Sequence, residues 1–243
     1  MTRQRLDLAI EARGLLPSRA RARDAILRGT VSVNGVPVTR PGRQVGPEDQ
    51  IALADPAAGY VSRAALKLIA GLDAGGIDVA GKICLDVGAS TGGFSQVLLE
   101  RGASRVYAVD VGHGQLHETL RDPRLVSLER TDARSLSREL VPEEIDFLCC
   151  DVSFVSARKV LAAPLALCRP GAQAAILVKP QFETGPEAIG KGGIVSDPAV
   201  IDQAVADVTS FMAGLGWSLI SSVPSPIAGG EGNREMVAVF ART

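Results

Sequence analysis

Apolar positions in the first 56 residues recur with two different spacings. Over 6–16 and 18–28 they recur every three or four residues, which is the spacing of a helix with one buried face. Ser18 and Gly29 are suited to begin and end the second helix. Over 31–38 apolar and polar residues alternate around Asn34-Gly35, which predicts a β-hairpin, and a last strand is predicted over 50–53. The pattern predicts a small α+β domain over residues 1–56 and a linker over 57–61.

Over residues 62–243 short apolar runs alternate with helical periods. Ser62 can cap a first helix that continues to about Leu72. Alternation of this kind predicts an α/β domain, with a mostly parallel sheet and helices on both faces. Another strand is expected before Asp132. The runs predicted as strands are 83–87, 105–111, 144–151, 173–179, 217–223 and 236–241. The periods predicted as helices are 93–101, 114–121, 157–168 and 198–214.

Composition excludes several classes of protein. Hydrophobic residues make up 46% of the chain, yet no run of about 18 apolar residues could span a membrane. The N-terminus lacks the apolar segment and cleavage site of a secretory signal, so we expect a cytoplasmic protein. The four cysteines lie in apolar surroundings and are predicted to be core residues. With two histidines and no CxxC spacing, no metal site is expected.

Positive charge is concentrated at the N-terminal end. Residues 1–43 contain nine arginines and three acidic residues, a net charge of +6, whereas the whole chain carries −1 and the remaining 200 residues therefore −7. A basic segment on an acidic protein indicates a module that binds a polyanion. A solvated helix face with internal salt bridges would have the same composition, and charge alone does not separate the two interpretations.

The first candidate ligand-binding segment follows the strand predicted over 83–87. The strand ends Asp86-Val87-Gly88 and runs through a loop of small residues into a helix, so backbone can pass closely beneath a ligand. Asp110 and Asp132 follow the next strands. A single acid at a strand end is usually only solvated, and such a loop can also be structural. Three acids at successive strand ends favour a nucleotide-like ligand.

This arrangement resembles the first motif of class I methyltransferases, whose loop surrounds the methionine part of S-adenosylmethionine. The resemblance implies a Rossmann-like seven-stranded sheet, with the cofactor's ribose at Asp110 and its adenine at Asp132. An NAD site would account for Asp110 but not for Asp86 or for Ser90, and we rank it lower. The residues implied to bind the cofactor are Asp86, Gly88, Ala89, Ser90, Thr91, Gly92, Gly93, Phe94, Asp110, Asp132 and Ala133.

Two charged residues close later strands. Asp151 follows the run that begins at 144, and Lys179 follows four apolar residues and precedes Pro180. A buried ammonium needs partners, so Lys179 must leave the sheet or be paired. By position alone, a structural salt bridge between Asp151 and Lys179 is as good an interpretation as catalysis. Transfer of a methyl group to a hydroxyl needs a group that takes the proton, and a lysine held by carboxylates can do so.

Resemblance favours catalysis. Lys67, Asp151, Lys179 and Glu235, in their local motifs, are similar to the Lys-Asp-Lys-Glu tetrad of FtsJ-like ribose 2′-O-methyltransferases. From about residue 3 to 242 the chain resembles the TlyA family, whose members are called both hemolysins and ribosomal RNA methyltransferases. The resemblance implies that Lys179 accepts the proton of a ribose 2′-hydroxyl, that Asp151 and Lys67 position it, and that Glu235 orients the lysines or the ribose. It further implies a cytidine in ribosomal RNA as substrate, and large-subunit RNA because no C-terminal extension follows the last strand.

The N-terminal domain resembles the small RNA-binding domain first described in ribosomal protein S-four. The matching motifs are Ser18-Arg19-Ala20-Arg21-Ala22, Ile26-Leu27-Arg28-Gly29 and Val31-x-Val33-Asn34-Gly35. The resemblance implies that a basic face contacts structured RNA, either ribosomal RNA or a ribosomal subunit. The candidate RNA-binding residues are Arg3, Arg5, Arg19, Arg21, Arg23 and Arg28.

Several alternatives stay open at this stage. An RNA base methyltransferase would need a Pro-Pro-aromatic segment, or a cysteine nucleophile, where this chain has Asp151-Val-Ser-Phe154. A catalytically silent RNA-binding or ribosome-assembly factor would share the fold. A pore-forming hemolysin is disfavoured, because the sequence has no amphipathic or secreted segment that would support this function. The glycine-rich stretch over 184–193 is either a lid or an ordinary connection. The oligomeric state is not indicated.

Overall fold

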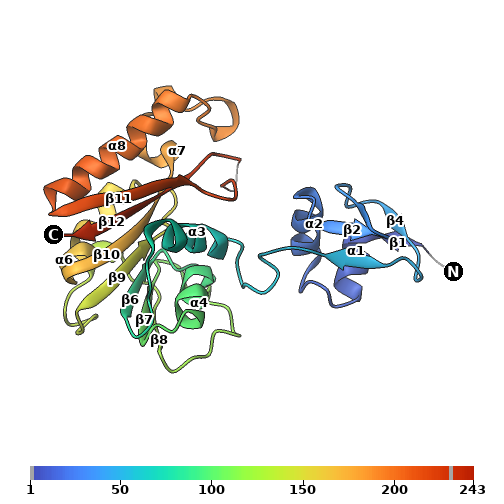
Figure 1. Cartoon of the computed structure of the whole chain (residues 1–243), viewed down its shortest axis with the longest axis horizontal. Coiled ribbons are helices and arrows are strands. Elements are labelled where there is room, and N and C mark those ends of the chain that lie inside the picture. The colour runs from blue at the N-terminus through green and yellow to red at the C-terminus, as the bar shows by residue number, and fades with distance from the viewer. Residues whose placement is uncertain (1–2, 230–231) are drawn as a thin grey trace. The chain divides into compact units, whose positions relative to one another are not determined.

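The computed structural model describes residues 3–229 and 232–243, and the chain forms two compact units, Met1–Gly59 and Tyr60–Thr243. The first unit is α+β, with two helices, a three-stranded sheet in the order β3-β2-β5 and a two-stranded sheet of β1 and β4. Its elements are β1 (Gln4–Arg5), α1 (Leu6–Ala12), α2 (Arg19–Leu27), β2 (Val31–Val33), β3 (Val36–Pro37), β4 (Gln44–Val45) and β5 (Ile51–Leu53) (Figure 1).

Local chemistry explains the ends of these elements. The Ser18 hydroxyl accepts a hydrogen bond from the Arg21 amide at 3.3 Å, so the predicted N-cap is confirmed. Asn34 and Gly35 both have positive φ, at 51° and 77°, which matches the predicted turn between β2 and β3. The first helix ends at Ala12, earlier than predicted. Its continuation is stopped by Gly14, which takes a left-handed φ of 67°.

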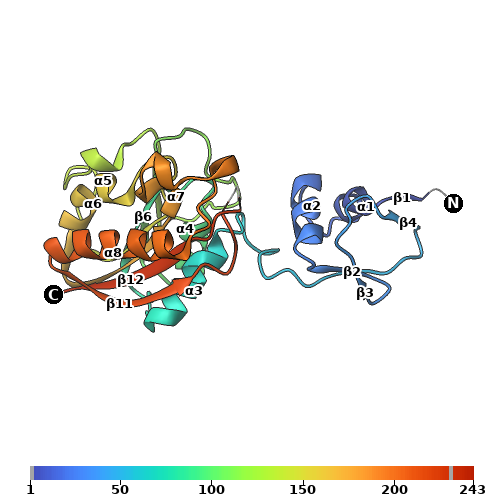
Figure 2. The same cartoon turned by 90° about the horizontal axis from the view of Figure 1, so that it is seen from above.

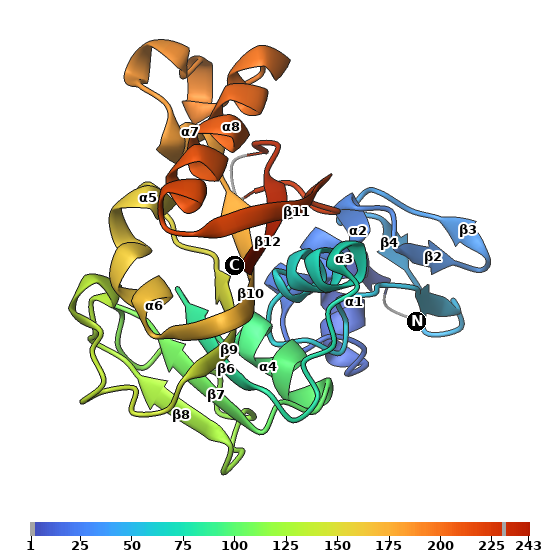
Figure 3. The same ribbon diagram turned by 60° about the vertical axis from the view of Figure 1, so that its left-hand side comes forward.

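The second unit is built on a seven-stranded sheet in the order β11-β12-β10-β9-β6-β7-β8, which confirms the predicted class I methyltransferase architecture. Neighbouring strands from β10 to β8 are parallel, and β12 runs antiparallel to both β10 and β11. Figure 3 shows the sheet from β8 at one edge to β11 at the other. The strands are β6 (Ile83–Val87), β7 (Arg105–Val109), β8 (Leu125–Leu128), β9 (Ile145–Cys150), β10 (Cys168–Val178), β11 (Trp217–Pro224) and β12 (Met236–Arg242).

Helices cover both faces of this sheet, as Figures 1 and 2 show. On one face α3 and α4 bury Leu68, Leu72 and Leu98 against the strands. On the other, α5, α6 and α8 bury Val160, Leu165 and Val208 respectively. The helices are α3 (Ala65–Gly75), α4 (Gly93–Glu100), α5 (Ala157–Val160), α6 (Ala162–Ala166), α7 (Pro180–Glu183) and α8 (Pro198–Gly214). All four cysteines are buried, as predicted.

The helix predicted over 114–121 is wrong, because the segment is a series of turns. The carboxylate of Glu129 accepts hydrogen bonds from the backbone amides of Gly114, Gln115 and Leu116, at 2.6, 2.8 and 3.2 Å. A side chain distant in sequence therefore takes the amides that a helix would have used. The strand expected before Asp132 is β8.

The helix predicted over 157–168 is interrupted. It consists of α5 and α6, and β10 begins at Cys168 instead of residue 173. Pro164 has no amide hydrogen for the carbonyl of Val160, so a continuous helix cannot pass this point. The remaining predicted elements of this unit agree with the structure to within three residues at each end.

Candidate active site

Four charged residues that are distant in sequence meet at the carboxyl ends of the parallel strands. Asp151 and Lys179 follow β9 and β10, which are parallel neighbours, so their carboxyl ends lie side by side. Because β12 is antiparallel to β10, the amino end of β12 lies beside the carboxyl end of β10, and Glu235, which precedes β12, lies there as well. Lys67 comes from α3, which packs on β10, β11 and β12. The topology of the sheet thus brings these four positions together.

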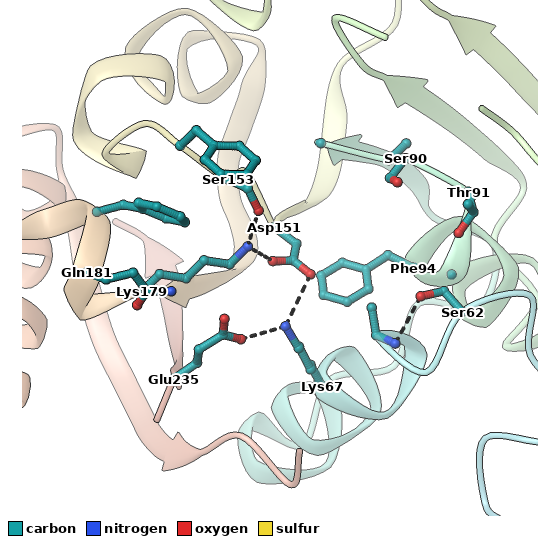
Figure 4. A pocket seen from close by; sticks show the side chains of 16 residues that line it. Ser62, Lys67, Ser90, Thr91, Phe94, Asp151, Ser153, Lys179, Gln181 and Glu235 are labelled. Atoms are coloured by element: carbon teal, nitrogen blue, oxygen red, sulfur yellow. Dashed lines mark hydrogen bonds and ion pairs between the residues drawn. The ribbon is translucent and has the colours of Figure 1, made fainter. Parts of the chain in front are cut away.

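The side chains form a chain of alternating charge (Figure 4). Lys179 Nζ lies 2.6 Å from Asp151 Oδ1, and Lys67 Nζ lies 3.7 Å from Asp151 Oδ2. On its other side Lys67 Nζ donates to Glu235 Oε2 at 2.5 Å. Lys67, Lys179 and Glu235 are 7%, 6% and 4% exposed, so the lysines are buried but paired. Pairing offsets the high cost of desolvating an ammonium.

These residues line a cavity of about 500 Å³. A closed salt-bridge cluster would fill such a space, whereas this one leaves the ammonium groups beside an open volume. The loop between β6 and α4 forms another part of the wall. The lining residues are Ser62, Ala64, Lys67, Gly88, Ala89, Ser90, Thr91, Gly93, Phe94, Asp151, Ser153, Phe154, Lys179, Gln181, Phe182 and Glu235.

The loop follows closely against the end of β9. A Cβ on Gly88, whose φ is 84°, would lie 3.0 Å from the carbonyl oxygen of Asp151. Only glycine fits this position without moving the strand end that carries Asp151. Ser90 also has a positive φ, 47°, and its amide donates to Asp110 Oδ2 at 2.8 Å. Asp110 therefore holds the loop as well as presenting a carboxylate.

A second cavity of about 370 Å³ adjoins the first and shares Gly88, Ser90, Asp151, Ser153 and Phe154 with it. The other predicted cofactor residues that line it are Asp110, Asp132 and Ala133. The Arg134 guanidinium donates to Asp132, and these hydrogen bonds lower the pKa of Asp132 to about 2. The carboxylate is therefore an ionised acceptor at neutral pH.

Two residues predicted to bind the cofactor line neither cavity. Asp86 is fully buried behind the loop and accepts from the Ser95 hydroxyl at 2.7 Å, and burial raises its pKa to about 7. Gly92 packs against Leu116 and Leu120, where a Cβ would collide with both side chains. Both residues support the loop from behind and do not face the cavities.

Comparison with known proteins agrees with this architecture. The FtsJ-like methyltransferase model matches residues 60–242, and the S4 domain model matches residues 4–51. The TlyA protein of Mycobacterium tuberculosis, a 16S/23S rRNA (cytidine-2′-O)-methyltransferase, is 43% identical over 96% of this chain and 88% of its own length. The chain belongs to the TlyA family of FtsJ-like methyltransferases.

Other TlyA-family relatives carry a hemolysin name. Hemolysin A of Brachyspira hyodysenteriae is 40% identical, over 97% of this chain and 99% of its own length. A solved structure from Streptococcus thermophilus, also under a hemolysin name, is 36% identical and has a TM-score of 0.77, covering 100% of this chain and 90% of that one. None of the described helices is both long and apolar enough to cross a membrane.

The six arginines predicted to bind RNA fall into two groups. Arg5 and Arg19 donate to the fully buried carboxylate of Asp7, and Arg28 forms a two-pronged pair with Asp55 at 2.6 and 2.9 Å. Arg21 donates to the carbonyl of Ala57. Arg3 and Arg23 are exposed and form no hydrogen bond or ion pair within 4 Å among residues 3–229 and 232–243, although Arg3 attracts the Asp49 carboxylate at longer range. The structure therefore leaves these two guanidinium groups most available to a polyanion.

The structure adds candidates that sequence reasoning did not single out. The hydroxyl of Ser153 accepts a hydrogen bond from Lys179 Nζ at 2.9 Å. Phe154 has a φ of 65°, its side chain is 90% exposed, and its ring lies 5.5 Å from that of Phe182. Glu183 is buried against the start of α5. No sequence signal marks an exposed phenylalanine with positive φ, because apolar residues in loops are usually packed.

Proposed function

We propose that this protein transfers a methyl group from S-adenosylmethionine to the 2′-hydroxyl of a ribose in ribosomal RNA. The observation that carries the proposal is the cluster of Lys67, Asp151, Lys179 and Glu235 in one cavity beside the glycine-rich loop. The name of the Mycobacterium tuberculosis relative supports a cytidine as the target. Action on ribosomal RNA would take place in the cytoplasm.

The residues present fit the cofactor. Gly88 lines both cavities, and because it has no Cβ the loop can lie directly against the backbone of Asp151, so that loop and strand end form adjoining walls of the site. In the adjoining cavity, Asp110 and Asp132 are carboxylate acceptors suited to ribose hydroxyls and an adenine amino group. When bound, S-adenosylmethionine supplies a methyl group activated by a sulfonium.

The chain's own residues must orient the ribose hydroxyl and take its proton. In this proposal Lys179 Nζ, in its neutral form, accepts the proton as the oxygen bonds to the methyl carbon. The O–H bond breaks and an N–H bond forms, while the methyl carbon would lose its bond to sulfur, which would leave as a neutral thioether. Asp151 stabilises the resulting ammonium from 2.6 Å. Lys67, held by Glu235, fixes the other oxygen of the Asp151 carboxylate.

The buried cysteines weigh against the carbon-directed alternative. Carbon-directed methylation requires a cysteine nucleophile in the active site, but Cys149 and Cys150 are fully buried within β9 and line neither cavity. Burial raises the pKa of the Cys150 thiol to about 12, so it stays protonated. A hydroxyl acceptor suits this site better than a base carbon.

Methyl transfer to ribosomal subunits tests the proposal. Labelled S-adenosylmethionine, ribosomal subunits and wild-type protein should give labelled RNA, and mass spectrometry after nuclease digestion should locate the label on ribose. Lys179→Met should lower single-turnover transfer by at least about 1,000-fold, because it removes the proton acceptor. Lys82→Met is the control, since Lys82 Nζ donates to Gln173, which pairs with Phe147 near the amino end of β9, away from Asp151 at the carboxyl end. Label on a base, or equal transfer by Lys179→Met, would contradict the proposal.

A further inference from the structure

Ser153 lies where it can control the direction of the Lys179 amine. It follows β9 by three residues, and it lines both the cavity with the charged cluster and the adjoining one. Its hydroxyl oxygen is 2.9 Å from Lys179 Nζ, and Figure 4 shows it on the same side of Lys179 as Asp151. Ser153 is therefore in contact with the amine but is not one of the four charged residues.

The number of bonds at Lys179 Nζ explains why this contact matters. The amine of a lysine rotates freely about its last bond, and the ion pair with Asp151 at 2.6 Å, which does not fix the direction of the N–H bonds, leaves that rotation possible. The hydrogen bond to the Ser153 hydroxyl restricts this rotation. Within residues 3–229 and 232–243 Nζ has no third partner, so the remaining direction stays available in the cavity that Lys179 lines. A base must point its lone pair at the proton it takes.

We propose that Ser153 is a positioning residue. Together with Asp151 it orients the amine of Lys179 so that the nitrogen lone pair faces the ribose 2′-hydroxyl. This inference rests on the function proposed above. The same hydrogen bond stabilises the ammonium after it has taken the proton, because the hydroxyl oxygen is then an acceptor for a charged donor. Ser153 takes no proton itself, and the bonds made and broken in the reaction are unchanged.

The proposal predicts a loss in the chemical step without a loss in binding. Ser153→Ala removes one hydrogen bond to a charged group. We expect the rate constant of methyl transfer in a single turnover, and kcat with it, to fall about tenfold. The KM values for ribosomal subunits and for S-adenosylmethionine should stay within about twofold, because Ser153 acts through Lys179. Ser153→Thr keeps a hydroxyl at this exposed position and should restore most of the rate.

The experiment compares wild type, Ser153→Ala, Ser153→Thr, Lys179→Met and the control Ser104→Ala, whose hydroxyl donates to the Lys82 carbonyl outside both cavities. Calorimetry with S-adenosylmethionine checks that each variant is folded. A tenfold loss that threonine restores supports the inference. The inference would be overturned if Ser153→Ala reacted as fast as wild type, or if only KM changed. It would also be overturned if Ser153→Thr did not restore the rate. If wild type transfers no methyl group, or if Lys179→Met stays active, the proposed function fails whatever Ser153 does.

Discussion

At the scale of single residues, Gly229 leaves room for the carboxylate of Glu235. A Cβ at this position would collide with Glu235 Oε1 and lie 3.1 Å from its Cδ. Glu235 has to remain where it is to hold Lys67 at 2.5 Å. The glycine therefore shapes the charged cluster without belonging to it.

We accordingly expect Gly229→Ala to lower kcat about tenfold or more, because the displaced carboxylate no longer holds Lys67. Thermal stability should change little, since a flexible side-chain end can move aside. Gly214→Ala is the matched control, because nothing lies within 4 Å of a Cβ at the end of α8. Methyl transfer and thermal unfolding of both variants measure the effect. Equal kcat in the two variants would show that the position of Glu235 does not matter.

Asp7 carries a second prediction at this scale. It is fully buried in the N-terminal unit, and hydrogen bonds from the Arg5 guanidinium, aided by Arg19, hold the pKa of this carboxyl down to about 2. A carboxyl with a lowered pKa in the folded state stabilises it above the unfolded pKa of about 4, and this stabilisation is lost as pH falls toward about 2. It amounts to about 2 kcal/mol at neutral pH.

Asp7→Asn should therefore destabilise the N-terminal unit by about 2 kcal/mol at pH 7, and its difference from wild type should largely disappear near pH 2. Because this unit has no tryptophan or tyrosine, hydrogen exchange of α1 amides in the full chain is the suitable measurement. A difference that stays constant from pH 7 to pH 2 would show that the ion pairs do not contribute as proposed.

At the scale of elements, α7 is pinned to α5 by one carboxylate. Glu183, at the end of α7, accepts from the Ser156 hydroxyl at 2.6 Å, the Ala157 amide at 2.7 Å and Arg158 Nε at 3.0 Å. Lys179 immediately precedes α7, and the segment with Asp151 and Ser153 immediately precedes α5. The carboxylate thus joins the two segments from which the charged cluster is built.

Glu183→Gln should loosen this junction, because an amide cannot accept all three hydrogen bonds as a carboxylate does. We expect a stability loss of about 2 kcal/mol and a fall in kcat that exceeds any change in S-adenosylmethionine affinity. Glu187→Gln, on the exposed part of the same segment, is the control and should behave as wild type. Denaturant unfolding and single-turnover transfer provide the two measurements. A normal kcat in a destabilised Glu183→Gln would assign the residue to stability alone.

At the scale of the whole molecule, charge is divided between the two units. Met1–Gly59 contains nine basic and six acidic residues, a net charge of +3, and Tyr60–Thr243 contains 17 basic and 21 acidic residues, a net charge of −4. An acidic catalytic unit repels RNA at long range. The N-terminal unit, matched by the S4 domain model, must then provide most of the electrostatic attraction.

We expect Arg3→Ala and Arg23→Ala to weaken RNA binding and each to lower the salt dependence of the affinity by about one unit of slope. Neither should alter stability much, since no hydrogen bond or ion pair within 4 Å is made by either side chain among the described residues, and the attraction of Arg3 to Asp49 acts between exposed groups. Arg28→Ala should instead destabilise the unit, because Asp55, whose side chain is 3% exposed, loses its partner. Binding at several salt concentrations, with hydrogen exchange for stability, separates the two groups. Unchanged binding in the first two variants would exclude them from the RNA interface.

Features that depend on neighbours in the chain could be predicted from the amino-acid sequence. The helical period of 198–214, the turn at Asn34-Gly35 and the alternation behind the parallel sheet are local patterns, and α8, the hairpin and the sheet agree with them. Asp110, Asp151 and Lys179 were singled out because they follow strands, and parallel neighbouring strands end on the same side of a sheet. Lys67 and Glu235 were named only by resemblance to the FtsJ-like tetrad.

Features that depend on distant partners could not be predicted in this way. The Glu129 carboxylate binds backbone amides of 114–121, where a helix was expected. Asp86 accepts a hydrogen bond from the buried Ser95. Ser153 and Lys179 form a hydrogen bond although they are 26 residues apart in the chain. Three of the six candidate arginines donate to carboxylates inside their own unit. Hydrogen bonds and burial at these positions are set by groups that only packing brings within 3 Å or so, and spacing along the chain carries no record of them.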